Sequence, residues 1–117
     1  MKAPTVDLTF DIGATDFVQF QIQSEGSNVD ITGYAIKCEV RKAFDTAVVK
    51  EFSIANGKIA IISEAAGSFQ LDMSDADSAD FQPTIYKYDI FTTNLSGEDE
   101  MVVRGDMKFC NRSTVVV

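Results

Sequence analysis

The sequence predicts an all-β fold, an immunoglobulin-like (Ig-like) antiparallel β-sandwich of about eight strands with one short helix near residues 74–81. Apolar and polar residues alternate with a period of two along most of the chain, as in strands that bury one face. Turn residues separate these runs, and only one short segment has the features of a helix. The 117 residues fit one domain, which we place at 1–117.

The alternation locates the strands. The runs cover residues 6–12, 18–22, 36–40, 48–54, 58–63, 69–73, 86–90 and 101–109. Within them, Val48 and Met101 are assigned to inward-facing positions. Ten further inward members are expected to be mainly buried: Val18, Phe20, Ile36, Val40, Phe69, Leu71, Tyr88, Ile90, Val103 and Phe109.

Asn56 and Gly57 form a tight-turn dipeptide. In a two-residue hairpin loop both central positions need a positive φ, which Asn and Gly tolerate best. We therefore expect this turn to join residues 50–54 to residues 58–63 as a β-hairpin.

A second turn is predicted over residues 30–34. Asp30 can accept hydrogen bonds from the backbone amides of Thr32 or Gly33, and Gly33 can adopt a positive φ before Tyr34. We interpret this segment as a structural turn that helps to define the fold, and not as a ligand site.

The short helix has a capping signal. Ser74 can cap its first turn, and Asp75 and Asp77 are favoured at the positive helix N-terminus. Together with Asp80 they resemble part of a calcium loop, but the central Gly and the distal Glu of such a loop are missing. Helix capping explains them without a metal, so we expect no metal and no cofactor.

Catalytic groups are scarce. The chain has no histidine, which removes the commonest general base and metal ligand. Cys38 lies on an apolar strand face, and neither it nor Cys110 fits a metal-binding spacing; a disulfide between them stays open. The acidic residues alternate outward or gather in loops, as on solvated surfaces. The sequence therefore predicts a protein that is not an enzyme.

The charge is strongly negative. Eighteen acidic residues against ten basic ones give a net charge of −8. Binding to nucleic acid or to an anionic membrane needs clustered basic residues, so neither partner is expected. The N-terminus lacks the apolar core of a signal peptide, which predicts synthesis in the cytoplasm.

Several apolar residues are candidates for an interface. Phe17 and Phe91 lie in the opposite register to the apolar faces of their strands, so they are either exposed or in strands buried on both sides. The triplet Val115, Val116 and Val117 has no polar cover and predicts docking on another subunit, against the alternative of a frayed tail. The expected state is a homo-oligomer, or a monomer whose C-terminus docks on another protein.

A set of short motifs occurs in a recognisable order. The motifs are Gly13–Phe20, Glu25-Gly26, Val29–Tyr34, Val40-Arg41, Tyr86–Ile90 and Val103–Phe109. This order resembles small phage and prophage β-domains like the N-terminal domain of upper baseplate proteins in lactococcal phages. Pro83-Thr84 stands where that family has a glycine.

The resemblance implies a virion structural protein of tail or baseplate type. Its expected partners are other virion structural proteins, and its expected location is the host cytoplasm during synthesis and then the virion. The alternative is an Ig-like module that binds carbohydrate or a cell surface. Tyr86 and Tyr88 are the candidates for its sugar-stacking platform, although they share a face with Ile90 and core packing is favoured.

Overall fold

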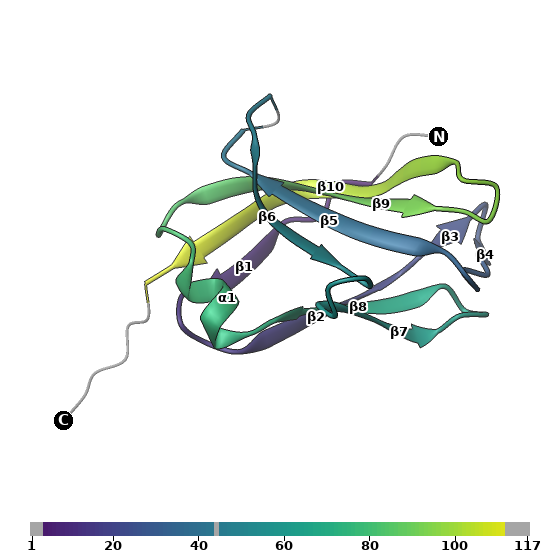
Figure 1. Ribbon diagram of the computed structural model, residues 1–117, viewed down its shortest axis with the longest axis horizontal. Helices are drawn as coiled ribbons and strands as arrows, with labels where there is room; N and C mark the ends of the chain where they lie inside the picture. The colour runs from purple at the N-terminus through teal and green to yellow at the C-terminus, as the bar shows by residue number, and fades with distance from the viewer. Residues whose placement is uncertain (1–3, 44, 112–117) are drawn as a thin grey trace.

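The computed structural model describes residues 4–43 and 45–111. Two β-sheets lie face to face and enclose one core (Figure 1). The elements are β1 (Leu8–Asp11), β2 (Asp16–Gln21), β3 (Gln23–Ser24), β4 (Ser27–Asn28), β5 (Ala35–Arg41), β6 (Val48–Ser53), β7 (Ile59–Ser63), β8 (Ser68–Met73), α1 (Asp75–Ala79), β9 (Ile85–Thr93) and β10 (Asp99–Cys110).

The strand order is that of an immunoglobulin-like sandwich. One sheet has the order β1-β10-β9-β5-β6 and the other β2-β8-β7, while β3 and β4 form a small separate hairpin. In immunoglobulin terms β5, β9 and β10 are the C, F and G strands, and β2, β8 and β7 are B, E and D. The all-β, Ig-like prediction is confirmed. The described residues form ten strands, against the eight expected, because the small hairpin adds two.

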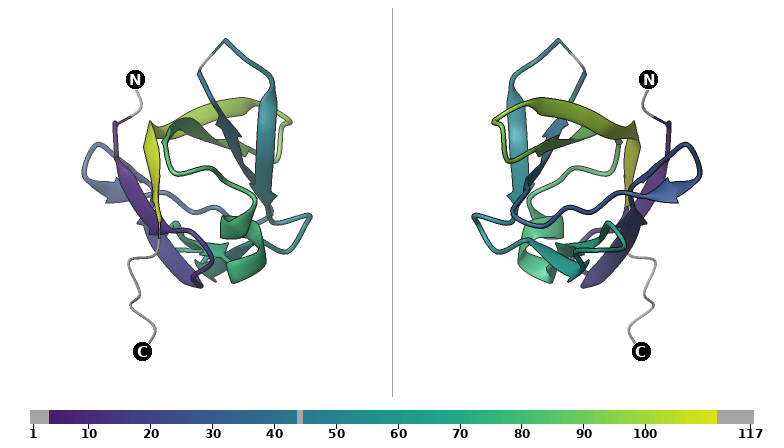
Figure 2. Two further views of the ribbon diagram at one scale, coloured as in Figure 1. Left: turned by 90° about the vertical axis from the view of Figure 1, so that its left-hand side faces the viewer. Right: turned by 90° about the vertical axis from the view of Figure 1, so that its right-hand side faces the viewer.

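The first strand departs from the constant-type arrangement, in which the A strand lies beside B. Here β1 pairs with β10, in parallel, with Leu8 opposite Met107 and Phe10 opposite Phe109. A bridge between Thr5 and Arg104 extends the contact. Figure 2, along the long axis, shows β1 and β2 on the same side of the sandwich, in different sheets. Among the described residues, β2 therefore has a strand neighbour on one side only.

The core is built from the inward members of the alternating strands. Eight of the ten expected positions are buried, while Val18 and Phe20 on β2 are half-buried. Phe69 stacks on Phe20 with ring centroids 5.3 Å apart, and Phe81 stacks on Phe109 at 4.0 Å. The two half-buried side chains lie on the strand that lacks a second neighbour.

The predicted register is wrong at two β-bulges, one in β10 and one in β6. Met101 pairs with Phe91 and Val103 with Ile90, so Val102 is the extra residue and Met101 turns outward. On β6, Lys50 lies opposite the buried Val40. Val48, expected inward, is 40% exposed. A bulge inserts one residue, which reverses the alternation on one side of it.

The hairpin predicted at Asn56-Gly57 is wrong, although the turn is present. β6 belongs to the five-stranded sheet and β7 to the three-stranded one, so the turn connects the two sheets. Gly57 has a φ of +79°, whereas Asn56 has no positive φ. The Asn56 side chain instead accepts from the Ser53 and Lys58 amides at 2.9 and 3.1 Å, which fixes a crossing turn.

The short helix α1 is held by its cap and by charge. The Ser74 hydroxyl accepts a hydrogen bond from the Asp77 amide at 3.0 Å. The Asp77 carboxylate, which is buried, accepts from Lys58 at 2.8 Å and pairs with Lys50 at 3.0 Å. Because Lys50 comes from the five-stranded sheet and Lys58 precedes β7, the helix is tied to both layers.

Candidate functional site

The sandwich is open along one side, between β2 and the first part of β10. Among the described residues, β2 pairs only with β8. β10 pairs with β9 over Asp99–Lys108, whereas β1 pairs with it only from Met107 on and the preceding residue Thr5 bridges to Arg104. Within residues 4–43 and 45–111, no strand covers the outer edge of Asp99–Val103 or of Asp16–Gln21. We call this opening the seam.

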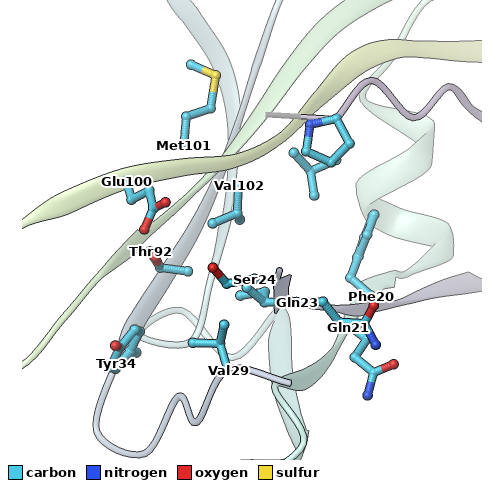
Figure 3. Close-up of a pocket in the computed structure, with 13 residues that line it drawn as sticks. Phe20, Gln21, Gln23, Ser24, Val29, Tyr34, Thr92, Glu100, Met101 and Val102 are labelled. Carbon is cyan, nitrogen blue, oxygen red and sulfur yellow. The ribbon is translucent and has the colours of Figure 1, made fainter. Parts of the chain in front are cut away.

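A cleft of about 300 Å³ lies in the seam (Figure 3). It is lined by Pro4, Phe20, Gln21, Ile22, Gln23, Ser24, Val29, Tyr34, Thr92, Glu100, Met101, Val102 and Val103. In Figure 3, Val102 and Glu100 lie on the cleft side of β10, while the Met101 side chain extends from the opposite side. The bulge at Val102 thus turns an extra apolar side chain into the cleft.

The floor of the cleft is apolar and its rim is polar. Phe20, Ile22, Val29 and Val102 are partly buried side chains that pack against the core. Gln21 and Gln23 on the rim both donate to Asn28, at 3.2 and 3.1 Å. A cleft with an apolar floor and a few polar groups at its edge is the usual form of a binding site.

A second, more polar pocket of about 280 Å³ adjoins the cleft. It is lined by Tyr34, Thr92, Asn94, Glu98, Asp99 and Glu100, three of which also line the cleft. Glu98 accepts from the Asn94 side chain at 3.0 Å, and Asp99 accepts from Thr93 at 2.6 Å. These two carboxylates therefore help to hold their own loop.

The end of the sandwich beside the cleft is strongly acidic. Three loops meet there: residues 22–34, 63–68 and 93–100, of which the first two are joined by a bond from the Ile31 amide to the Glu64 carbonyl at 2.9 Å (Figure 1). They carry six acidic residues and no lysine or arginine: Glu25, Asp30, Glu64, Glu98, Asp99 and Glu100.

The turn at Asp30–Tyr34 places one wall of this site. Asp30 accepts from the Thr32 hydroxyl at 2.6 Å and from the Thr32 amide at 2.9 Å. These two bonds lower the pKa of the Asp30 carboxyl. Gly33 has a φ of +78°, and the chain then brings Tyr34 to both the cleft and the polar pocket. The sequence predicts only a structural turn at Tyr34, because the other walls of the cleft come from residues far along the chain.

The structure does not bring Phe17 and Phe91, two of the predicted interface residues, together. Phe17 is 56% exposed and lies on β2, whereas Phe91 is half-buried on β9 of the other sheet. Val115, Val116 and Val117 lie outside the described residues. Neither Phe17 nor Phe91 lines the cleft. The apolar residues that do line it were missed because their sequence signal is that of core strands.

The remaining candidates have structural surroundings. Tyr86 and Tyr88 are buried and cannot form a sugar-stacking platform. Cys38 and Cys110 are both free, and burial raises the pKa of the Cys38 thiol, which disfavours its thiolate. In the part of the chain that is described, no three Asp, Glu, Cys or His residues are placed to hold a metal ion.

The acidic cluster of α1 is matched by lysines. Lys50 lies 2.7 Å from Asp80 and 3.0 Å from Asp77, which Lys58 also contacts. Burial opposes ionisation of Asp77, but the hydrogen bonds from Lys58 and Lys50 outweigh it and lower its pKa to about 2. These carboxylates therefore neutralise lysines.

None of the described helices is long and apolar enough to cross a membrane.

Comparisons with known proteins add no family. No protein-family model and no curated protein matches the sequence. The fold is similar to a structure of murine CRIg, at 13% identity and a TM-score of 0.40, with 92% of each chain covered. It is also similar to a structure of ICOS in complex with ICOS-L and an anti-ICOS-L VNAR domain, at 9% identity and a TM-score of 0.38, covering 94% of this chain and 56% of that one. Likeness at this level carries no argument about function.

Proposed function

We propose that this chain is a non-enzymatic assembly module, an Ig-like domain that joins other structural proteins in a phage or prophage particle of tail or baseplate type. The observation that carries the proposal is the seam. Two adjacent strand edges have no strand neighbour among the described residues, and part of the apolar core is open between them. Unpaired edges are normally covered or charged in a protein that acts alone.

The particle setting is supported by the order of motifs from Gly13 to Phe109, which resembles phage and prophage β-domains. The test is to delete the gene from the phage or prophage that carries it and to image the particles by electron microscopy. We expect particles that lack a tail or baseplate part, with the chain at fixed copy number in complete particles by mass spectrometry. Complete, infectious particles that do not contain the chain would refute the proposal.

A second candidate is an Ig-like module that binds carbohydrate. It is favoured by the polar pocket, which places Tyr34 near Asn94 and Glu100. Carboxylates, amides and an aromatic ring together suit the hydroxyl groups and apolar faces of a sugar. It predicts saturable glycan binding that is lost in Tyr34→Ala, measured by calorimetry, in a variant that still folds. If no glycan binds, the assembly proposal is left as the one to pursue.

A further inference from the structure

At the seam, none of the described strands occupies the position beside β2. In a complete immunoglobulin-like sandwich of constant type, a fourth strand lies next to the B strand. Here that neighbour is absent among the described residues, because β1 pairs with β10 in the other sheet. The opening between β2 and Asp99–Val103 is therefore bordered by strand edges on both sides.

The backbone of β2 has hydrogen-bonding groups directed into the seam. The Ile22 amide bonds to the Gly67 carbonyl at 2.9 Å, on the β8 side. Amides of alternate residues point to opposite sides of a strand, so those of Gln19 and Gln21 point to the open side. The amide of Phe17, in the same alternation, is bonded to the Asp16 side chain at 2.7 Å. The amide at the Phe17 end of the strand edge is therefore occupied by a local hydrogen bond. Among the described residues, the amides of Gln19 and Gln21, beside the cleft, have no strand partner.

The side chains around this edge define what can pair with it. A strand added beside β2 would direct every second side chain toward Phe20, Ile22 and Val102, which are partly buried apolar groups. The acidic loops at the same end, with Glu100 in the cleft wall, favour a positive charge at one end of the added strand.

From these observations we infer that the seam binds an extended segment of another protein, which pairs with β2 as an added strand. That segment has apolar residues at alternate positions and lysine or arginine at the end that meets the acidic loops. A second copy of this chain is a poorer occupant, because two chains of net charge −8 repel each other. The inference rests on the proposed assembly function and names the site and the class of partner.

The test uses a fluorescent decapeptide of four Thr-Val repeats preceded by Lys-Arg, added to the full chain. We expect saturable binding below about 1 mM, detected by anisotropy. A peptide with Glu-Glu in place of Lys-Arg should bind at least tenfold more weakly. If neither peptide binds, or if both bind equally well, the inference is wrong.

Three variants locate the binding. Glu100→Lys should weaken binding of the basic peptide at least tenfold, while Glu51→Lys, the same charge change on the exposed edge strand β6, should leave it unchanged. Gln19→Pro removes an amide directed into the seam and should abolish binding; proline is tolerated on edge strands, and circular dichroism checks the fold. Equal effects of Glu100→Lys and Glu51→Lys, or full binding by a folded Gln19→Pro variant, would overturn the inference.

Three further results separate the alternatives. If the chain dimerises and Gln19→Pro makes it monomeric, a second copy occupies the seam and the inferred partner is wrong. If particles assemble normally with the Glu100→Lys and Gln19→Pro variants incorporated, the inference fails but the assembly function stands. If the chain is absent from complete particles, the assembly function itself fails.

Discussion

At the level of single residues, burial separates two phenylalanines of one sheet. Phe69 on β8 is fully buried and stacks on Phe20, whereas Phe17 on β2 is 56% exposed. Truncation of a buried ring removes its transfer free energy and leaves a cavity. We expect Phe69→Ala to lower the free energy of unfolding by about 3–5 kcal/mol in urea titrations.

Phe17→Ala is the matched control, because it removes the same side chain from an exposed position. It should change the free energy of unfolding by less than about 0.5 kcal/mol. If the two variants were equally stable, Phe69 would not lie in the core as the structure has it.

Asp77 gives the fold a pH dependence. Its folded pKa of about 2 lies below the usual value of about 3.9 for an unfolded aspartate. The stability from its lysine contacts is therefore complete above about pH 5 and is lost as the pH falls toward 2, a change of about 2 kcal/mol. We expect Asp77→Asn to be less stable than the parent at pH 7, with the difference shrinking below pH 3.

Urea unfolding at pH 7 and at pH 2.5 measures this difference. Asp75→Asn, at an exposed carboxylate of the same helix, should leave the acid dependence of the parent in place. A stability gap between Asp77→Asn and the parent that is constant from pH 7 to pH 2.5 would contradict the assignment.

At the level of elements, period-two alternation was sufficient to place most strands, because one face of each is buried. It was not sufficient at Val48 or Met101, because each lies at a bulge. The inserted residue has no recognisable pattern in the sequence. The turn at Asn56-Gly57 shows a second limit. A turn dipeptide predicts that the chain reverses, but whether the next strand pairs in the same sheet depends on contacts far along the chain.

The cleft was unpredictable for the same reason. Phe20, Val29 and Val102 have the sequence signal of core residues. Their partial exposure follows only from the pairing of β1 with β10, which leaves β2 without a second neighbour in the described chain. That pairing in turn depends on close contact with a glycine.

Gly105 allows the first segment to lie against β10. A Cβ at this position would lie 2.1 Å from the Val6 carbonyl oxygen and 2.8 Å from its carbon, both backbone atoms. We expect Gly105→Ala to destabilise the fold by about 1–3 kcal/mol and to speed hydrogen exchange at the Val6 amide, which bonds to the Arg104 carbonyl. Gly97→Ala, where nothing lies near the added methyl group, should leave exchange at Val6 unchanged.

At the level of the whole molecule, charge and apolar surface are unevenly distributed. The acidic loops lie at one end, beside the cleft, and they hold six of the eighteen acidic residues of the chain. This asymmetry favours one mode of approach for a basic partner over others. This uneven charge is the reason for expecting a partner with a basic segment and not nonspecific association.

The predicted homo-oligomer is a separate matter, because it rests on Val115–Val117, outside the described residues. We expect the full chain to have a larger mass by light scattering than a chain that ends at Ser113. Equal masses, together with unchanged binding to neighbouring structural proteins, would refute a role for the valines in assembly.

The central claim is that β2 is an open strand edge, and amide hydrogen exchange of the free chain tests it most directly. The amides of Val18 and Phe20 point toward β8, whereas those of Gln19 and Gln21 point into the seam. The account predicts slow exchange at the first pair and fast exchange at the second, measured residue by residue by NMR. Protection of Gln19 and Gln21 as strong as that of Val18 and Phe20 would contradict it, because those amides would already be paired.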